Sequence, residues 1–110
     1  MEGLKRGDLA IVSLPGDYGK PRPALVVQSD FFSAVDSRTV LPLTSDGIEA
    51  PLFRIALDPS PENGLRLRSY IMVDKAYTMP RDKVGQVCGR VDDRTMLEIR
   101  QALAVFLGFA

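Results

Sequence analysis

The sequence predicts a small, mainly β domain of the barrel or sandwich type, closed by one C-terminal helix. Short segments rich in β-branched and other apolar residues recur up to residue 91, with turn-forming residues between them. After that point the hydrophobic period changes to that of a helix. The chain has 110 residues, 45% of them hydrophobic, and its formal net charge is zero. Such a chain can bury one core but not two, so we expect a single domain over residues 1–110.

Seven segments have the composition of strands. They are residues 9–14, 24–28, 39–44, 52–57, 69–73, 75–79 and 86–91. Pro42 lies inside the third segment, and a proline cannot donate to a strand ladder. The third strand is therefore expected at an edge of the sheet or at a bulge.

The last segment predicts an amphipathic helix. Asp92 or Asp93 supplies an N-cap, and Gly108 marks the end. We interpret the apolar stripe as the face of a helix that covers the core, which leaves room for a dimer contact. The stripe consists of Met96, Ile99, Leu103, Phe106 and Leu107.

Composition excludes several kinds of chemistry. The sequence has no histidine, so a histidine-based catalytic triad and a histidine-ligated metal are excluded. Cys88 is the single cysteine and is expected as a small buried hydrophobe; no cysteine cluster predicts a zinc site. No apolar run approaches the length of a membrane span, and the charged first residues lack the apolar segment of a signal peptide. We therefore expect a soluble cytoplasmic protein without a metal or other cofactor.

A few residues are candidates for chemistry. Arg22 lies between Pro21 and Pro23, which stiffen the backbone around a guanidinium suited to phosphate. Thr44 presents a hydroxyl where the third strand ends, and Asp74 follows the fifth. Each also has an ordinary interpretation: an exposed arginine in a rigid turn, a strand-end turn cap, and a solvated partner of nearby lysine or arginine.

The loop at residues 15–21 is longer than a tight hairpin needs. Gly16 and Gly19 favour mobility, and Tyr18 and Lys20 could contact a ligand. We expect this loop to gate a binding groove; the alternative is an ordinary surface loop. These residues alone do not name a function.

Taken together, the motifs resemble the MazF/PemK toxin family over nearly the whole chain. The matching pieces are RGDLAIV at 6–12, LPG at 14–16, KPRPALVV at 20–27, LPLTS at 41–45, NGL at 63–65 and SYIMVD at 69–74. The resemblance implies a CcdB/MazF-type, SH3-like barrel with a C-terminal helix, assembled as a homodimer. It also implies a bacterial toxin, neutralised by a cognate antitoxin, that cleaves single-stranded RNA without metal and leaves 2′,3′-cyclic phosphate and 5′-hydroxyl ends. Operator DNA would be bound only through the antitoxin complex.

The resemblance assigns catalysis to Arg22, Thr44 and Asp74. Met72 stands where some family members have an arginine, and a family histidine in the first loop has no counterpart here. Asp74 or a carboxylate from another loop would be the base. The residues expected to bind RNA are Tyr18, Lys20, Gln28, Ser45, Ser69, Lys75 and Arg81.

Two other functions remain open. A CcdB-like gyrase poison would share the fold, but its helix ends in an exposed tryptophan, and this sequence has no tryptophan. A binding module that has lost catalysis is the third possibility, for which Met72 is the best argument.

Overall fold

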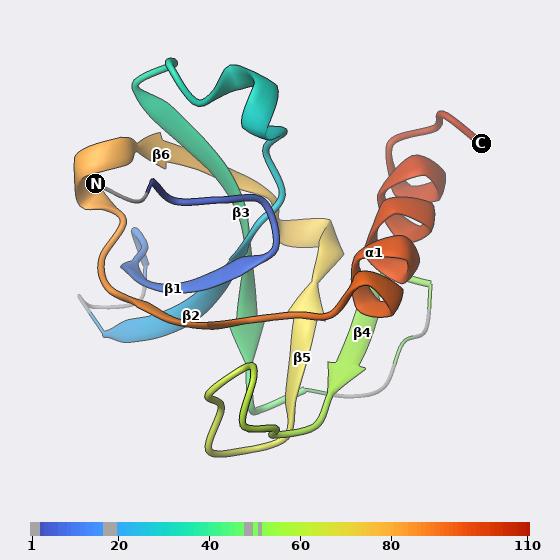
Figure 1. Ribbon diagram of the computed structural model, residues 1–110. Coiled ribbons are helices and arrows are strands. Elements are labelled where there is room, and N and C mark those ends of the chain that lie inside the picture. The colour runs from blue at the N-terminus through green and yellow to red at the C-terminus, as the bar shows by residue number, and fades with distance from the viewer. Residues whose placement is uncertain (1–2, 17–19, 48–49, 51) are drawn as a thin grey trace.

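The computed structural model describes residues 3–16, 20–47, 50 and 52–110, and within them an antiparallel sheet curls into a half-barrel (Figure 1). A helix packs beside the sheet. The strands are β1 (Asp8–Ser13), β2 (Pro21–Val26), β3 (Ser37–Thr44), β4 (Arg54–Leu57), β5 (Ser69–Met72), β6 (Tyr77–Pro80) and β7 (Val87–Arg90). The helices are α1 (Asp93–Phe106) and the 3₁₀ turns η1 (Asp30–Phe32), η2 (Val73–Lys75) and η3 (Arg81–Lys83). The mainly β fold with a C-terminal helix is thus confirmed.

The strands follow the order β4-β5-β3-β2-β1-β7, and β6 also pairs with β3. The expectation that Pro42 marks an edge strand is wrong, because β3 is central and Pro42 pairs with Ala24 of β2. On its other side, β3 pairs with β6 over residues 37–40 and with β5 at residues 43–44. Pro42 lies between these two pairings, where the ladder changes partner and a missing N–H costs little.

The central strands are buried on both faces, which explains their nearly continuous apolar runs. Leu9, Leu25 and Leu41 are in register across β1, β2 and β3, and all three belong to the core shared with α1. The alternate positions, including Ala10 and Val26, form a second core inside the curl of the sheet. Strand residues alternate between two faces, so a sheet with a core on each face needs apolar residues at every position.

Helix α1 begins and ends as predicted. The Asp92 side chain accepts a hydrogen bond from the Thr95 backbone N–H, and Gly108 follows with a φ of 81°. Ile99 is fully buried against the core. The predicted stripe is too long, because the helix extends past the sheet and leaves Phe106 exposed, together with Leu107. In the described part of the chain, no helix has the length and apolar character that a membrane span requires.

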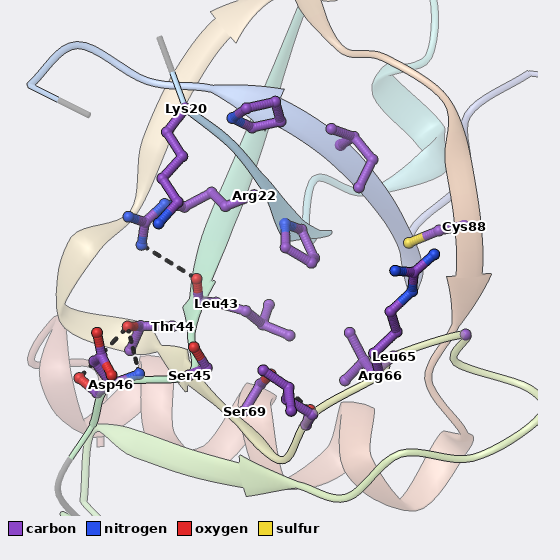
Figure 2. Close-up of a pocket in the computed structure, with 15 residues that line it drawn as sticks. Lys20, Arg22, Leu43, Thr44, Ser45, Asp46, Leu65, Arg66, Ser69 and Cys88 are labelled. Atoms are coloured by element: carbon purple, nitrogen blue, oxygen red, sulfur yellow. Dashed lines mark hydrogen bonds between the residues drawn. The ribbon is translucent and has the colours of Figure 1, made fainter. Parts of the chain in front are cut away.

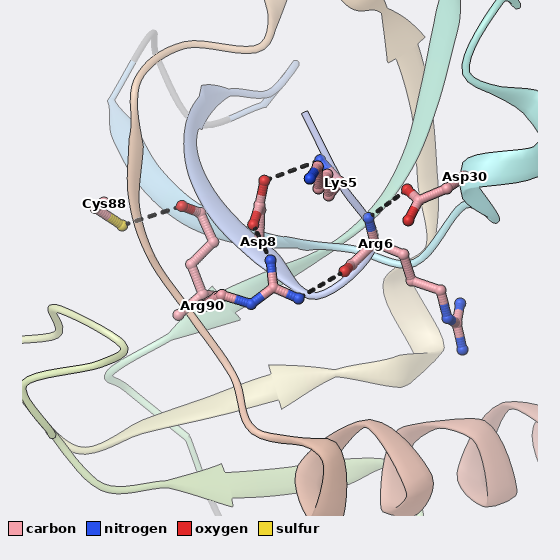
Figure 3. Close-up of polar contacts among 7 residues, drawn as sticks. Lys5, Arg6, Asp8, Asp30, Cys88 and Arg90 are labelled. Carbon is pink, nitrogen blue, oxygen red and sulfur yellow. Dashed lines mark hydrogen bonds and ion pairs between the residues drawn. The ribbon is translucent and has the colours of Figure 1, made fainter. Parts of the chain in front are cut away.

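At one end of the sheet β1 pairs with β7, and polar contacts link this pair to the residues before β1 (Figure 3). The buried Asp8 carboxylate accepts hydrogen bonds from the Lys5 backbone N–H at 2.8 Å and from Arg90 Nη1 at 2.6 Å. Arg90 also donates to the Arg6 carbonyl oxygen at 3.2 Å. Gly7 adopts a φ of +96° beside Arg90, where a Cβ would lie 3.0 Å from the guanidinium. This part of the RGDLAIV motif therefore has a structural role.

Candidate functional site

Arg22 is held at the open end of β2. It pairs with Val12 of β1, but β2 gains β3 as its other neighbour only from Ala24 onward. The flanking prolines, Pro21 and Pro23, lie where the ladder is one-sided, so their missing N–H groups are tolerated there. The Arg22 side chain is half-buried, and its Nη1 donates to the Leu43 carbonyl oxygen at 3.3 Å (Figure 2). This contact fixes the guanidinium next to the end of β3.

The first pocket lies beside Arg22 and has a volume of about 490 Å³ (Figure 2). It brings together five residues that the sequence predicted for the site: Lys20, Arg22, Thr44, Ser45 and Ser69. The hydroxyl of Thr44 accepts a hydrogen bond from the Asp46 backbone N–H at 3.2 Å, which fixes the turn after β3. The ordinary interpretation of Thr44 as a turn cap is therefore correct, and the same side chain also lines the pocket.

Besides Asp46, two further polar side chains that were not predicted for the site line this pocket, Arg66 and Cys88. Arg66 adds a third cation. Cys88 is exposed rather than buried as expected, and its Sγ donates to the Leu9 carbonyl oxygen at 3.4 Å. Partial burial of the thiol raises its pKa, so it stays protonated at neutral pH. Neither residue has a local sequence signal, because each reaches the pocket through tertiary packing of a loop or an edge strand.

The second pocket, of about 470 Å³, shares Arg22 with the first. It contains Asp74 and Lys75, both predicted for the site. The rest of its lining is mostly apolar and includes one aromatic ring: Leu14, Pro15, Pro42, Met72, Ala76 and Tyr77. Arg22 thus stands between a pocket of cations and hydroxyls and a pocket of apolar walls with one carboxylate.

The carboxylate of Asp74 is bound by an arginine that the sequence analysis did not identify. Arg54 Nε donates to Asp74 Oδ1 at 2.8 Å, and Arg54 Nη2 donates to Oδ2 at 3.0 Å. The side chains are 19% and 16% exposed, respectively. The expectation of a solvated partner of Lys75 or Arg81 is therefore wrong. Arg54 lies on β4 directly opposite Met72 of β5, a pairing invisible in the linear sequence.

This pairing determines the protonation of Asp74. The hydrogen bonds from Arg54, the largest cause, hold the pKa of the Asp74 carboxyl below its ordinary value, while partial burial opposes them. The pKa of Arg54 is raised by the same hydrogen bonds. A general base works best when its pKa lies near the working pH, so Asp74 is a poor proton acceptor but a stable anionic hydrogen-bond acceptor.

Gln28 and Arg81 do not join the two pockets. Gln28 Nε2 donates to the Ser37 carbonyl oxygen at 3.0 Å, and its Oε1 accepts from the Thr39 N–H at 3.0 Å. The Arg81 N–H donates to the Asp36 carbonyl oxygen at 2.7 Å. Both residues therefore lie where β3 begins, at the opposite end of that strand from Thr44. Tyr18 and the centre of the predicted gating loop fall at residues 17–19, outside the described residues.

The chemistry available here suits a nucleic-acid strand. Guanidinium and ammonium groups with hydroxyls beside them match a phosphodiester. An apolar wall with an aromatic ring and one acceptor matches the face and edge of a base. Among the described residues, no group of three or more His, Cys, Asp or Glu side chains is arranged to hold a metal ion.

Comparison with known proteins identifies the family. Residues 5–107 match the model of the PemK-like, MazF-like toxin of type II toxin–antitoxin systems. A probable endoribonuclease MazF of Mycolicibacterium smegmatis is 43% identical over 108 residues, which cover 97% of this chain and 99% of that protein.

Solved structures agree with this assignment. An endoribonuclease from a mycobacterial species is 25% identical with a TM-score of 0.77, covering 98% of this chain and 94% of that one. An endoribonuclease in complex with its cognate antitoxin, also from a mycobacterial species, shares the fold with a TM-score of 0.81 at 24% identity, covering 98% of each chain. On the family match and the full-length relative, the chain belongs to the PemK-like, MazF-like toxins of type II toxin–antitoxin systems.

Proposed function

We propose that this protein is an endoribonuclease toxin that cleaves single-stranded mRNA sequence-selectively and without metal, and so inhibits growth. The observation that carries the proposal is the position of Arg22, shared by the two pockets and hydrogen-bonded to the residue preceding Thr44. A phosphodiester at Arg22 would place one flanking nucleotide in each pocket. The MazF relative that spans nearly the full length is named a probable endoribonuclease, which supports the same activity here.

In this mechanism the RNA supplies its own nucleophile. The 2′-oxygen forms a bond to phosphorus while the bond from phosphorus to the 5′-oxygen breaks, which leaves a 2′,3′-cyclic phosphate and a 5′-hydroxyl. Arg22 and Thr44 donate hydrogen bonds to the non-bridging oxygens, whose charge grows in the transition state. Asp46, a carboxylate that lines the first pocket, is our candidate to accept the 2′-hydroxyl proton. Water supplies the proton that the 5′-oxygen takes up as it leaves. Asp74 is less suited to the base role, because the hydrogen bonds from Arg54 lower its pKa.

The experiment is incubation of the purified protein with a mixed RNA in excess EDTA, followed by mapping of the ends. We expect cleavage with cyclic phosphate and 5′-hydroxyl termini. Activity that is lost in EDTA and restored by magnesium would overturn the metal-independent mechanism. Binding of RNA without cleavage would instead favour the non-catalytic module, and inhibition of gyrase without any effect on RNA would favour the CcdB-like poison.

The partners follow from the same assignment. A cognate antitoxin is proposed as the inhibitor, since a structural relative was solved in complex with one.

We also propose a cytoplasmic homodimer whose RNA path crosses both subunits, with operator DNA bound only through the antitoxin complex. Exposed apolar residues are available for these contacts in and just after η1 and at or just past the end of α1: Phe31, Phe32, Val35, Val105, Phe106, Leu107 and Phe109. Light scattering at micromolar concentration tests the dimer, and a mass near the 12.1 kDa of one chain would contradict it.

A further inference from the structure

The geometry of the Arg54–Asp74 pair suits Asp74 to accept a hydrogen bond from a ligand rather than to transfer a proton. A carboxylate has about four lone-pair sites, and the two parallel hydrogen bonds from Arg54 occupy one site on each oxygen. The backbone N–H of Asp74 also acts on the carboxylate, and the lone-pair sites left over can accept a donor from the second pocket, which Asp74 lines. Because both of its oxygens are fixed, the carboxylate cannot turn to follow a ligand.

The surroundings of Asp74 keep it ionised. Arg54 contacts it from β4 and Lys75 acts on it from η2. Arg22 from β2 and Tyr77 from β6 line the same pocket. Helix α1, which packs against η2, contributes Ile99 to the adjoining core. Asp74 therefore presents a permanent acceptor and no donor to whatever enters the pocket.

The other walls of the second pocket suit a flat, apolar ligand. Met72 presents apolar surface, the buried Pro42 lies at the pocket wall, and the exposed ring of Tyr77 offers a face on which a base can stack. Because Arg22 lines both pockets, the second pocket adjoins the proposed position of the phosphate. A nucleobase attached to that phosphate would bring its edge to Asp74.

We propose that the second pocket holds the base of a nucleotide next to the cleaved phosphate. Asp74 accepts a hydrogen bond from an exocyclic amine of that base, and Arg54 is the positioning residue that fixes the carboxylate. This inference rests on the proposed function. Adenine, cytosine and guanine each carry an exocyclic amine. Uracil carries none: its ring donor, N3–H, lies between two carbonyl oxygens, and these repel a carboxylate. The pocket therefore disfavours uracil by about tenfold or more.

The first test measures binding and does not depend on cleavage. The methionine methyl groups are labelled with ¹³C, and the Met72 signal is followed by NMR during titration with AMP, CMP, GMP or UMP. We expect UMP to require about tenfold more nucleotide than CMP or AMP for the same shift. In Arg54→Gln this difference should collapse, and Arg54→Lys, which keeps the charge with one contact, should restore part of it.

The matched control is Arg68→Gln. Arg68 also pairs with an aspartate, Asp58, but at the surface, where the two side chains are 48% and 71% exposed. This variant should keep the wild-type order of nucleotides. Equal binding of UMP and CMP by the wild type would overturn the inference, as would an unchanged order in a folded Arg54→Gln protein. If Arg54→Gln fails to fold, Asp74→Asn provides the same comparison, because an amide that also donates should admit uracil.

The second test reads selectivity during cleavage. A randomised RNA is cut in EDTA, and the ends are sequenced. We expect one position next to the cut to exclude uracil in the wild type and to accept it in Arg54→Gln, with other positions unchanged. If the wild type fails to cut RNA, the proposed function fails while the nucleotide titration still decides the pocket's preference. If the wild type cuts but tolerates uracil at every neighbouring position, this inference alone fails.

Discussion

The two pockets joined by Arg22 differ in how their charges are balanced. The first gathers the cations Lys20 and Arg66, with the carboxylate of Asp46, near hydroxyl groups at the end of β3. The second holds one carboxylate that Arg54 already neutralises, among largely apolar walls. Cations and hydroxyl groups bind the phosphate of any nucleotide, whereas a fixed acceptor distinguishes one base from another. The first pocket is therefore suited to binding the RNA backbone and stabilising the transition state, and the second to selecting a base.

The largest effect should come from Arg22, which serves both pockets. Arg22→Ala should lower the single-turnover cleavage rate by at least about 100-fold, as for loss of one donor to a developing oxyanion. Arg22→Lys should recover little of this rate, because a point charge does not replace a planar fork of donors. Circular dichroism should show both variants folded. A folded Arg22→Ala protein that cuts RNA near the wild-type rate would refute the assignment.

Thr44 should produce the next largest effect, confined to the first pocket. Thr44→Val removes one donor to the phosphate and should slow cleavage by about tenfold, with the affinity for uncut RNA nearly unchanged. Thr39→Val is the matched control on the same strand, since Thr39 bonds to Thr78 at 2.6 Å away from both pockets. Equal losses of rate in the two threonine variants would mean that Thr44 acts through the stability of β3.

The ion pair at the second pocket should be detected by how the stability of the fold changes with pH, rather than with salt concentration. The folded-state pKa of Asp74 is lowered, so the Arg54–Asp74 pair stabilises the fold above the unfolded pKa of about 3.9, and this contribution is lost as pH falls below that value. Arg54→Gln should therefore lower the urea midpoint at pH 7, and the difference from wild type should shrink towards pH 3. Arg68→Gln should change the midpoint less at either pH, because its ion pair is exposed. An Arg54→Gln difference that is the same at both pH values would contradict the pairing.

Lys20 should have the smallest effect. It is an exposed cation at the edge of the first pocket, so Lys20→Ala should weaken RNA binding by only a few-fold at low salt. The difference should fade as salt is added, and the cleavage rate at saturating RNA should stay the same. A loss that persists in high salt would indicate a specific contact with the RNA.

The predictability of the two pockets differs for a physical reason. Arg22, Thr44 and Ser45 are fixed by local features, namely prolines on both sides and the end of a strand, which can be identified in the sequence. Arg54 contacts Asp74 because β4 pairs with β5, which places Arg54 opposite Met72, 18 residues later in the sequence. No local pattern specifies that pairing.

The same distinction holds for the fold. Strand segments and the cap at Asp92 depend on neighbouring residues and were predicted close to their observed bounds. The central place of β3 and the exposure of Phe106 depend on which elements end up as neighbours. Gln28 was assigned to RNA by resemblance, yet its amide is used to hold the chain at the start of β3.

The most direct test of the central claim is a structure of the protein with a short RNA that carries a 2′-deoxy nucleotide at the cut position and so cannot react. We expect the adjoining phosphate oxygens within about 3 Å of the Arg22 guanidinium. One flanking nucleotide should lie in the first pocket, and the base of the other should direct its amine to Asp74 in the second. An RNA bound with its uncut phosphate away from Arg22, or with both pockets empty, would contradict the account.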